Sequence, residues 1–331
     1  MISATHTSRL TALAGVTFLF LGCSVAPTMK DVEVLTADTH IVYGSVDVFG
    51  TKGKRQEWGM GWTGSNYFYL MILPAGSSEA ITYKLDDDGM FYWALEPGDY
   101  TLLGYHWAKG QEARSGHLGA GFNVSDTNVD SYLGSIVLQN IGFGLLPRID
   151  DRFDLVAPLY DAKFPQRQGT SARNTVDMTT ELGNVAAFRH QCDAAWGIEC
   201  NDRFRGITPL SPECKKTGFP MTPSLQPTFS WQASINDEVT YDLVLYEAAA
   251  YSIGGMLKNS YIRGHQIAYI EGLEQTSWTP PESLRPDTRY FWSVRLRDGG
   301  TVSPWSTQSH FTFALVAWSS GSGQWFQFKT S

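Results

Sequence analysis

The feature that most constrains the fold is a succession of short strand-like runs with no helix-length segment between them. Turn-forming sequences such as Asp86–Gly89 and Glu96–Asp99 separate the runs, since Gly permits positive φ and Pro fixes φ near −65°. Parallel strands need a crossover of about a dozen residues or more, so this spacing predicts antiparallel β-sandwiches. The runs are Ile41–Val48, Tyr67–Leu73, Ala80–Leu85, Phe91–Leu95, Tyr100–His106 and, after a polar loop around 123–130, Tyr132–Leu138.

The C-terminal third repeats this pattern. In Tyr290–Arg297 every second residue is bulky and apolar, and Thr240–Glu247 alternates in the same way. A period of two places such residues on one face of a strand. In the first of these runs we expect Phe291, Ser293, Arg295 and Arg297 on the outward face.

Composition agrees with a folded chain and restricts its partners. Hydrophobic residues make up 43% and charged residues 18% of the sequence, which excludes wholesale disorder. With 25 Lys and Arg against 33 Asp and Glu, the net charge is −8. Nucleic-acid binding needs clustered Lys and Arg, so we expect no nucleic-acid partner.

The N-terminus has the features of an export signal. Leu10–Leu21 is an apolar run without charge, preceded by Arg9. As a helix it would extend about 18 Å, which is too short for a bilayer core of about 30 Å and fits a signal peptide. Gly22 before Cys23 resembles the bacterial lipoprotein box, although Phe20 and Leu21 depart from its usual residues.

The resemblance implies that Cys23 is lipidated, with acyl chains such as palmitate, and becomes the first residue of the mature protein. Several acyl chains hold a protein on a membrane far more firmly than one. By the sorting rules of such lipoproteins, Ser24 implies the outer membrane, with the periplasmic or surface face left open. The alternatives are a secretory signal cut elsewhere and a buried helix.

Gly89–Leu102 resembles the G-x-F-x-x-x-L-x-P-G-x-Y-x-L hairpin of transthyretin-like (carboxypeptidase regulatory-like) domains. The resemblance covers residues 38–140 and implies one strand through the Phe and first Leu, a turn at Pro-Gly, and a return strand through the Tyr and last Leu. Domains of this kind are mostly adhesive or structural. The matching residues are Phe91, Leu95, Pro97, Gly98, Tyr100 and Leu102.

Leu284–Tyr290 carries an L-x-P-x-T-x-Y pattern that resembles the tyrosine corner of fibronectin type III domains, where the Tyr hydroxyl bonds back to the preceding chain. Trp231 matches the early core Trp of such domains, and Ser303–Ser306 resembles the Trp-Ser turn near their end. This resemblance covers residues 220–331. Two departures are a long insertion at Ala248–Ile262 and a final strand delayed by Ala314–Gln324.

These patterns predict a mainly β protein with two antiparallel sandwiches, transthyretin-like and then fibronectin type III-like, joined by a loop-rich segment. We expect one short helix in Ile149–Phe164, capped by Asp150 or Asp151 and interrupted by Pro158. The expected divisions are a signal peptide at 1–22, a tether at 23–39, the first sandwich with its helix at 40–168, a connector at 169–223 and the second sandwich at 224–331.

Three cysteines remain after Cys23, and an oxidising compartment favours disulfides over zinc. We expect a Cys192–Cys200 bridge with Cys214 free, while the other pairings stay open. His190 and these three cysteines could supply four zinc ligands, but their spacing matches no common zinc site. We therefore expect no metal and no cofactor.

Two further segments have alternative interpretations. Trp58 and Trp62 flank a Gly-rich loop beside several cations, and exposed Trp can stack on sugars or anchor an interface. Most Trp in two sandwiches are core residues, so both uses compete with burial. The acidic turn Asp86–Gly89 could hold Ca²⁺, but it lacks the ligand spacing of a calcium loop and fits a solvated turn better.

The sequence contains none of the common catalytic motifs, and its seven His are scattered. A triad assembled in space stays open. We expect a non-enzymatic outer-membrane lipoprotein that binds a protein of the envelope. The alternatives are a carbohydrate- or peptidoglycan-binding lipoprotein that uses exposed Trp and, less favoured, an envelope hydrolase.

Overall fold

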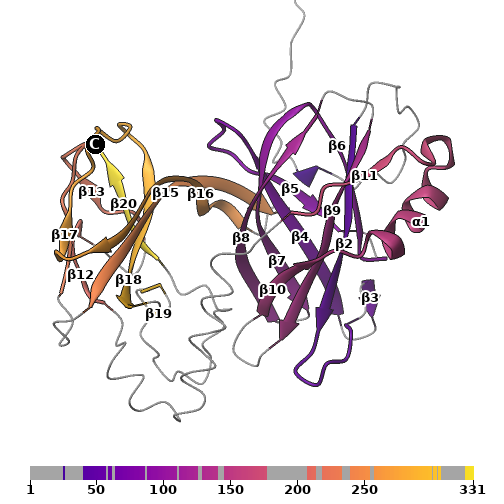
Figure 1. Cartoon of the computed structure of the whole chain (residues 1–331), viewed down its shortest axis with the longest axis horizontal. Helices are drawn as coiled ribbons and strands as arrows, with labels where there is room; N and C mark the ends of the chain where they lie inside the picture. The colour runs from indigo at the N-terminus through magenta and orange to yellow at the C-terminus, as the bar shows by residue number, and fades with distance from the viewer. Residues whose placement is uncertain are drawn as a thin grey trace, which may run out of the picture.

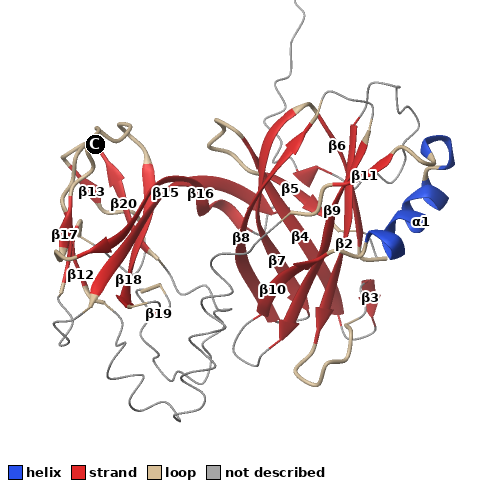
Figure 2. Cartoon of the chain, in the orientation of Figure 1, coloured by secondary structure: helices blue, strands red, loops and turns tan. Residues whose placement is uncertain are grey.

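The part of the chain that the computed structural model describes contains two β-sandwiches and one α-helix, so the predicted mainly β fold is confirmed (Figure 1, Figure 2). Among the residues that it describes, no helix is long and apolar enough to cross a membrane. The described residues are 25–26, 40–56, 59–61, 64–85, 88–109, 112–125, 129–140, 145–176, 207–213, 218–232, 239–253, 257–299, 301–303, 305–306 and 325–331.

The first sandwich consists of two sheets. One has the order β1-β5-β4-β7-β8, with β3 paired to β4, and the other has the order β10-β9-β2-β6, with β11 paired to β9. The first sheet is formed by β1 (Val25–Ala26), β3 (Gly59–Gly61), β4 (Gly64–Pro74), β5 (Ile81–Lys84), β7 (Gly98–Lys109) and β8 (Glu112–Val124). The second is formed by β2 (His40–Phe49), β6 (Met90–Leu95), β9 (Asp130–Asn140), β10 (Leu145–Asp150) and β11 (Ser171–Arg173).

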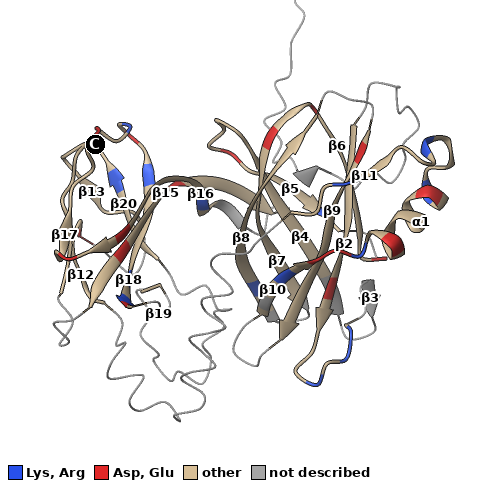
Figure 3. Ribbon diagram, viewed as in Figure 1, with Lys and Arg blue, Asp and Glu red and all other residues tan. Residues whose placement is uncertain are grey.

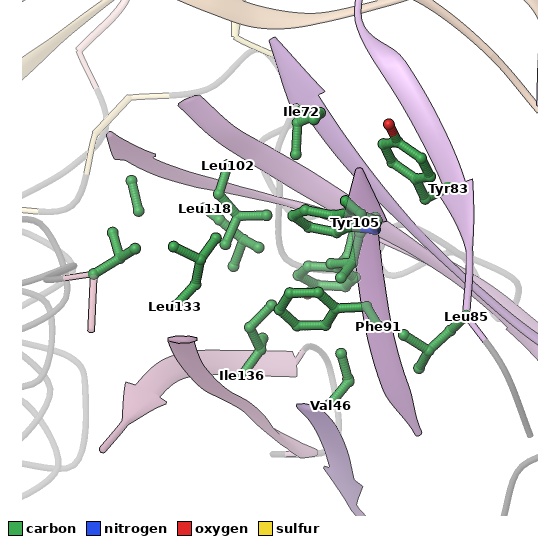
Figure 4. Close-up of a cluster of buried hydrophobic side chains, with 14 of the residues drawn as sticks. Val46, Ile72, Tyr83, Leu85, Phe91, Leu102, Tyr105, Leu118, Leu133 and Ile136 are labelled. Atoms are coloured by element: carbon green, nitrogen blue, oxygen red, sulfur yellow. The ribbon is translucent and has the colours of Figure 1, made fainter. Parts of the chain in front are cut away.

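The core of this sandwich forms where the apolar faces of the two sheets meet. Phe91 and Ile136 extend from one sheet toward Leu102 and Leu118 of the other, and Figure 4 shows them in one cluster. All four side chains are buried. Alternate residues along each strand supply this layer, as the period-two pattern predicts.

The opposite face of the second sheet is covered by α1 (Phe153–Lys163). Tyr43 of β2 and Tyr92 of β6 pack there against Tyr160 and Phe164. Tyr43 stacks on Tyr160 with ring centroids 4.1 Å apart. The sheet therefore buries both faces, which explains why β2 is almost uniformly buried.

Three details differ from the sequence-based expectations. β6 and β7 belong to opposite sheets, so the expected hairpin is instead a corner between sheets, where the Tyr100 hydroxyl donates to the Glu96 carbonyl at 2.9 Å. β8 occupies a segment for which no strand was expected. α1 runs through Pro158 without a break and begins at Phe153, because Ile149 and Asp150 belong to β10.

The second sandwich also has two sheets, with orders β12-β14-β17 and β13-β20-β18-β15-β16; β19 pairs with β18. Trp231 and Trp292 lie in its core and are 2% and 0% exposed. The strands are β12 (Pro209–Ser211), β13 (Met221–Thr222), β14 (Phe229–Trp231), β15 (Thr240–Ile253), β16 (Leu257–Leu273), β17 (Ser277–Trp278), β18 (Arg289–Asp298), β19 (Thr301–Val302) and β20 (Phe326–Thr330).

The tyrosine corner expected from the fibronectin type III resemblance is present. The Tyr290 hydroxyl accepts the Arg285 N–H at 2.9 Å, and the tyrosine ring is buried. This hydrogen bond fixes the chain where it enters β18, as in other sandwiches with such a corner.

The hairpin β15–β16 extends beyond the second sandwich and contacts the first (Figure 1). Only Thr240–Glu247 of β15 pair with β18. Further along, the Ala250 N–H donates to the Ser78 carbonyl at 2.9 Å, and the Ala80 N–H donates to the Ala250 carbonyl at 2.8 Å. The predicted insertion is thus the part of the hairpin that joins the two sandwiches.

Side chains close this junction as well. Met71, Leu73 and Leu103 of the first sandwich pack with Ala249 of β15 and Ile262 of β16. Gly104 is required here, because a Cβ at that position would lie 2.8 Å from Ile262 Cδ1 and 2.4 Å from a backbone oxygen. Backbone hydrogen bonds and apolar packing together hold the sandwiches in one arrangement.

Candidate functional site

The sites predicted from the sequence lie outside the described residues, so these predictions stay predictions. The backbone between the two loop tryptophans is described, and it forms β3, which pairs with β4. The acidic turn is described from Asp88 onward, and this carboxylate accepts the Met90 N–H at 2.8 Å, as turn aspartates do. The predicted lipidation, ligand and disulfide residues concerned are Cys23, Trp58, Trp62, Cys192, Cys200 and Cys214.

In the first sandwich the buried carboxylate of Asp130 accepts hydrogen bonds that hold the fold together. Asp130 is 0% exposed and accepts from Arg167 Nε and Nη2 at 2.8 and 2.6 Å and from Tyr160 Oη at 2.6 Å. Thr170 and the Ile41 N–H also donate to it. Burial raises the pKa of Asp130, but these hydrogen bonds outweigh burial, so its pKa lies below the ordinary value. This carboxylate therefore holds α1 against the sheet.

The second sandwich has a corresponding carboxylate, Asp242 on β15, which is also 0% exposed. It accepts from Arg295 Nε at 2.8 Å, from Arg297 Nε and Nη2 at 2.7 and 2.8 Å, and from the Gly272 N–H at 3.1 Å. Burial raises the pKa of Asp242, but hydrogen bonds from Arg297 and Arg295 lower it by more, so its pKa lies below the ordinary value. A carboxylate with this many fixed donors stays ionised and cannot serve as a base near neutral pH.

His106 and His117 lie on the paired strands β7 and β8. His106 Nδ1 is 2.7 Å from the hydroxyl of Ser115, its cross-strand partner, but no described carboxylate binds its other nitrogen, as a catalytic triad would need. His265 Nε2 donates to the Ser77 carbonyl at 3.1 Å. His117 packs edge-on against Tyr246. The described residues contain no group of three or more His, Cys, Asp and Glu placed to hold a metal.

A concentration of aromatic rings and guanidinium groups lies on the outer face of the sheet formed by β13, β20, β18, β15 and β16. We call it the aromatic–arginine face. Along β18, side chains of this face alternate with core side chains such as Trp292 and Val294, which point inward. Its members come from β15, β16, β18 and three short segments, and they are Phe219, Tyr246, Tyr261, Arg263, Tyr269, Arg289, Phe291, Arg295, Trp305 and Trp325.

Each of the three arginines stacks on two rings. Arg263 lies 3.9 Å from the centroid of the Trp325 ring, and Arg295 lies 4.4 Å from that of Trp305. Arg289 lies 4.6 Å from the Tyr261 centroid. The second rings are farther away: Tyr246 at 5.8 Å from Arg263, Tyr269 at 6.0 Å from Arg295, and Phe219 at 5.7 Å from Arg289.

The rings also contact one another, so the face is continuous. Trp305 and Trp325 have centroids 5.8 Å apart, and Phe219 lies 5.4 Å from Phe291 and 5.3 Å from Tyr261. Cation–π and edge-to-face contacts of this kind fix side chains in one orientation. The face is consequently preorganised, and ordering it on binding would cost little entropy.

The face combines buried and accessible parts. Trp325 and Phe291 are 7% and 8% exposed, whereas Arg263, Arg289 and Tyr261 are half-buried. Trp, Tyr and Arg are the residues enriched at the energetic centres of protein interfaces. Half-buried guanidinium edges over fixed rings can bind carboxylate and carbonyl oxygens of a partner protein.

Sequence analysis placed Phe291, Ser293, Arg295 and Arg297 on the outward face of β18, and the structure confirms their direction. Ser293 and Arg295 are nevertheless buried, at 0% and 4% exposed. The Ser293 hydroxyl donates to the Ser306 carbonyl at 2.7 Å, and Arg295 packs against the Trp305 ring. The available signal was Arg at alternate outward positions of an aromatic strand. The ring partners lie too far away in sequence to be assigned from spacing.

Comparisons with known proteins add no functional assignment. No family model matches the chain, and no curated protein matches it. Among solved structures it is similar to the FN1–FN3 domains of chicken CNTN1, with 10% identity and a TM-score of 0.19 over 82% of this chain, and it spans 64% of that chain. DUF3823 family proteins from Bacteroides ovatus and Parabacteroides merdae also align at 10% identity and TM-scores of 0.19, covering 80% and 82% of this chain and 96% and 98% of theirs. At such TM-scores the fold assignment rests on strand pairing.

Proposed function

We propose that this protein is a lipoprotein of the bacterial outer membrane, anchored at Cys23, that binds a protein of the cell envelope and catalyses no reaction. The observation that carries the binding function is the aromatic–arginine face, whose three arginines stack on fixed rings. The junction between the sandwiches supports a scaffold, because β15–β16 presents this face in a fixed relation to the first sandwich.

The buried charged groups support binding over catalysis. Asp130 and Asp242 each accept several hydrogen bonds from arginines that they also orient. A general acid or base needs a pKa near the working pH, and both carboxyl pKa values are shifted downward instead.

The face favours a protein ligand over a sugar. Sugar binding by Trp needs a ring face open to the ligand, and here guanidinium groups lie over Trp325 and Trp305. The carbohydrate alternative therefore depends on Trp58 and Trp62 alone. A glycan array with Trp58→Ala as the comparison tests it, and binding that is indifferent to this change removes that alternative.

The binding proposal is tested by crosslinking in intact cells followed by affinity purification of the full-length protein. Arg289→Ala removes a stacked guanidinium from the face. Arg285→Ala is the matched control, because Arg285 belongs to the same domain and its side chain is mostly exposed, where it forms a 3.3 Å ion pair with Glu247; the tyrosine corner uses the Arg285 backbone, which the change keeps. We expect one defined partner with the natural protein and the control, and at least roughly tenfold less with Arg289→Ala.

Equal recovery with Arg289→Ala and Arg285→Ala would show that the face is not the binding site. Recovery of no partner with the natural protein would contradict protein binding itself. Anchoring is tested separately by mass spectrometry of the N-terminal peptide and by Cys23→Ala, which should release folded protein from the membrane fraction.

A further inference from the structure

The helix α1 is apolar on the side that faces away from the protein. Its inner residues Val156, Ala157 and Tyr160 are buried against the sheet. On its outer side Leu155 and Leu159 are 71% and 56% exposed. Pro158 and Ala162 are exposed beside them. We call these four outer residues, at spacings of i, i+3, i+4 and i+7, the α1 ridge.

α1 also carries charged residues, among them the exposed Asp154 and Lys163, but an exposed apolar stripe on a surface helix is normally covered. Single exposed apolar residues are common and need no explanation. Leu155 and Leu159 differ because they are one helical turn apart and form one surface. The other large exposed apolar residues in the described part of the chain lie on other elements, namely Val129, Leu210, Met221, Ile267 and Tyr269.

The ridge is held rigidly in its outward orientation. The Tyr160 hydroxyl donates to Asp130 at 2.6 Å, and its ring stacks on Tyr43. Phe164 packs edge-on against Tyr92. α1 therefore cannot rotate to bury Leu155 and Leu159 without breaking the buried Asp130 network.

We propose that the α1 ridge inserts into the interfacial layer of the bilayer that holds the lipidated Cys23, and so sets the orientation of the protein on the membrane. This inference rests on the proposed lipid anchor. It adds a second membrane contact and a defined orientation, which an anchor alone does not provide.

The path of the N-terminal chain supports this occupant. The Ile41 N–H donates to Asp130 at 3.0 Å, and Asp130 in turn binds Tyr160 of α1. The Asp130 carboxylate thus links the first residues of β2 to α1. Cys23 lies two residues before Val25–Ala26, which pair with β5 in the other sheet of the same sandwich. The lipid anchor therefore belongs to the sandwich that carries the ridge.

The shape of the protein is consistent with such an orientation. Figure 1 is drawn with the longest axis horizontal, and α1 lies at one end of it while the second sandwich lies at the other. With the ridge on the bilayer, the second sandwich extends away from the membrane. The aromatic–arginine face is then presented to proteins at a distance from the lipid surface.

The size and charge of the ridge favour lipid over a protein partner. Four side chains expose on the order of a few hundred Å², whereas a stable protein interface buries roughly 1,000 Å² or more. A weak contact is sufficient for a protein that is already tethered, because its effective concentration is about millimolar. The neighbouring Arg152 and Arg173 are paired with Asp47 and Asp154, and Figure 3 shows both signs of charge on α1, so no net charge opposes approach.

The test is photocrosslinking in cells with benzoylphenylalanine placed at Leu155 or Leu159 of the full-length protein. Matched controls carry it at Leu210 or Met221, which are 63% and 66% exposed but lie on the second sandwich. All four positions are exposed, so folding is preserved. We expect phospholipid adducts at the two ridge positions, in at least roughly tenfold higher yield than at the controls.

The outcomes separate this inference from the anchor itself. If the protein is in the membrane fraction but the ridge positions crosslink to protein, or yield no more lipid adduct than the controls, the ridge inference is wrong while the anchor stands. If the unirradiated protein is found in the soluble fraction, the anchor is wrong and the ridge inference fails with it.

Discussion

The two sandwiches differ in what covers the outer face of the sheet that carries a buried carboxylate. Each has one sheet whose outer face carries a fully buried Asp, Asp130 in the first and Asp242 in the second. In the first sandwich a helix covers that face (Figure 2). In the second, stacked arginines and aromatic side chains cover it.

The difference has a functional consequence. A helix satisfies its own backbone and closes the face beneath it, so any further contact uses the outside of the helix. A layer of side chains covers the sheet but leaves guanidinium edges and ring edges half-buried, which suits a protein interface. This difference underlies the two proposals made above, membrane contact at α1 and partner binding on the second sandwich.

The largest expected effects come from removing the two buried carboxylates. Asp130→Ala leaves Arg167 buried without a counter-charge, and Asp242→Ala does the same to Arg295. Breaking such a pair typically costs about 3–5 kcal/mol. We expect Asp130→Ala to accelerate amide hydrogen exchange in α1, and Asp242→Ala to accelerate it in β15 and β18.

The controls for this pair are Asp130→Asn and Asp242→Asn, which keep the side-chain shape and part of the hydrogen bonding. They should lower the free energy of unfolding in urea by less than the alanine variants do. If Asp130→Ala left the exchange of α1 unchanged, the helix would be held by apolar packing alone, and the comparison between the two covers would fail.

A smaller loss of stability is expected when the corner tyrosines Tyr290 and Tyr100 lose their hydroxyl groups. Tyr290→Phe removes a partly buried hydrogen bond from the Arg285 N–H, and the free energy of unfolding should fall by about 1 kcal/mol. Tyr100→Phe removes a hydrogen bond to Glu96 that water can replace, because this bond is exposed. Its cost should therefore be smaller. Equal costs for both variants in thermal melts would show that burial does not distinguish the corners.

Much of the fold could be predicted because short apolar runs between turn residues indicate strands. The runs in β4 and β6 are almost continuously apolar, and the run in β18 alternates. β8 was missed because its outward positions include Gly119 and Gly121, which weaken strand propensity. The start of α1 was misplaced because Asp150 has the chemistry of a helix cap but pairs in β10.

The candidate surfaces were harder to predict, for two different physical reasons. The aromatic–arginine face requires side chains more than fifty residues apart, such as Arg263 and Trp325, to meet. Such contacts follow from topology and leave no local periodicity. The α1 ridge was hidden because Leu155 and Leu159 fit a core helix equally well. Their exposure follows only from which side Tyr160 and Val156 use for packing.

The smallest expected effect concerns the junction that keeps the two sandwiches together. Burial, and then the charge of Arg263, lower the pKa of His117 well below its ordinary value, so the joined state favours the neutral imidazole. An unfolded His titrates near 6.5. The stabilising contribution of neutral His117 is therefore complete above about pH 6.5 and falls as the pH drops below it, because the unfolded chain then binds more protons.

His117→Gln should reduce this pH dependence of the free energy of unfolding in urea. At about pH 5.5 it should also slow hydrogen exchange of the Ala80 and Ala250 amides relative to the natural protein. His106→Gln is the control, because burial also lowers the pKa of His106 but its hydrogen bond lies within the first sandwich. It should change the pH slope without changing exchange at the junction. If both variants altered junction exchange equally, acid would weaken the first sandwich as a whole and not its contact with the second.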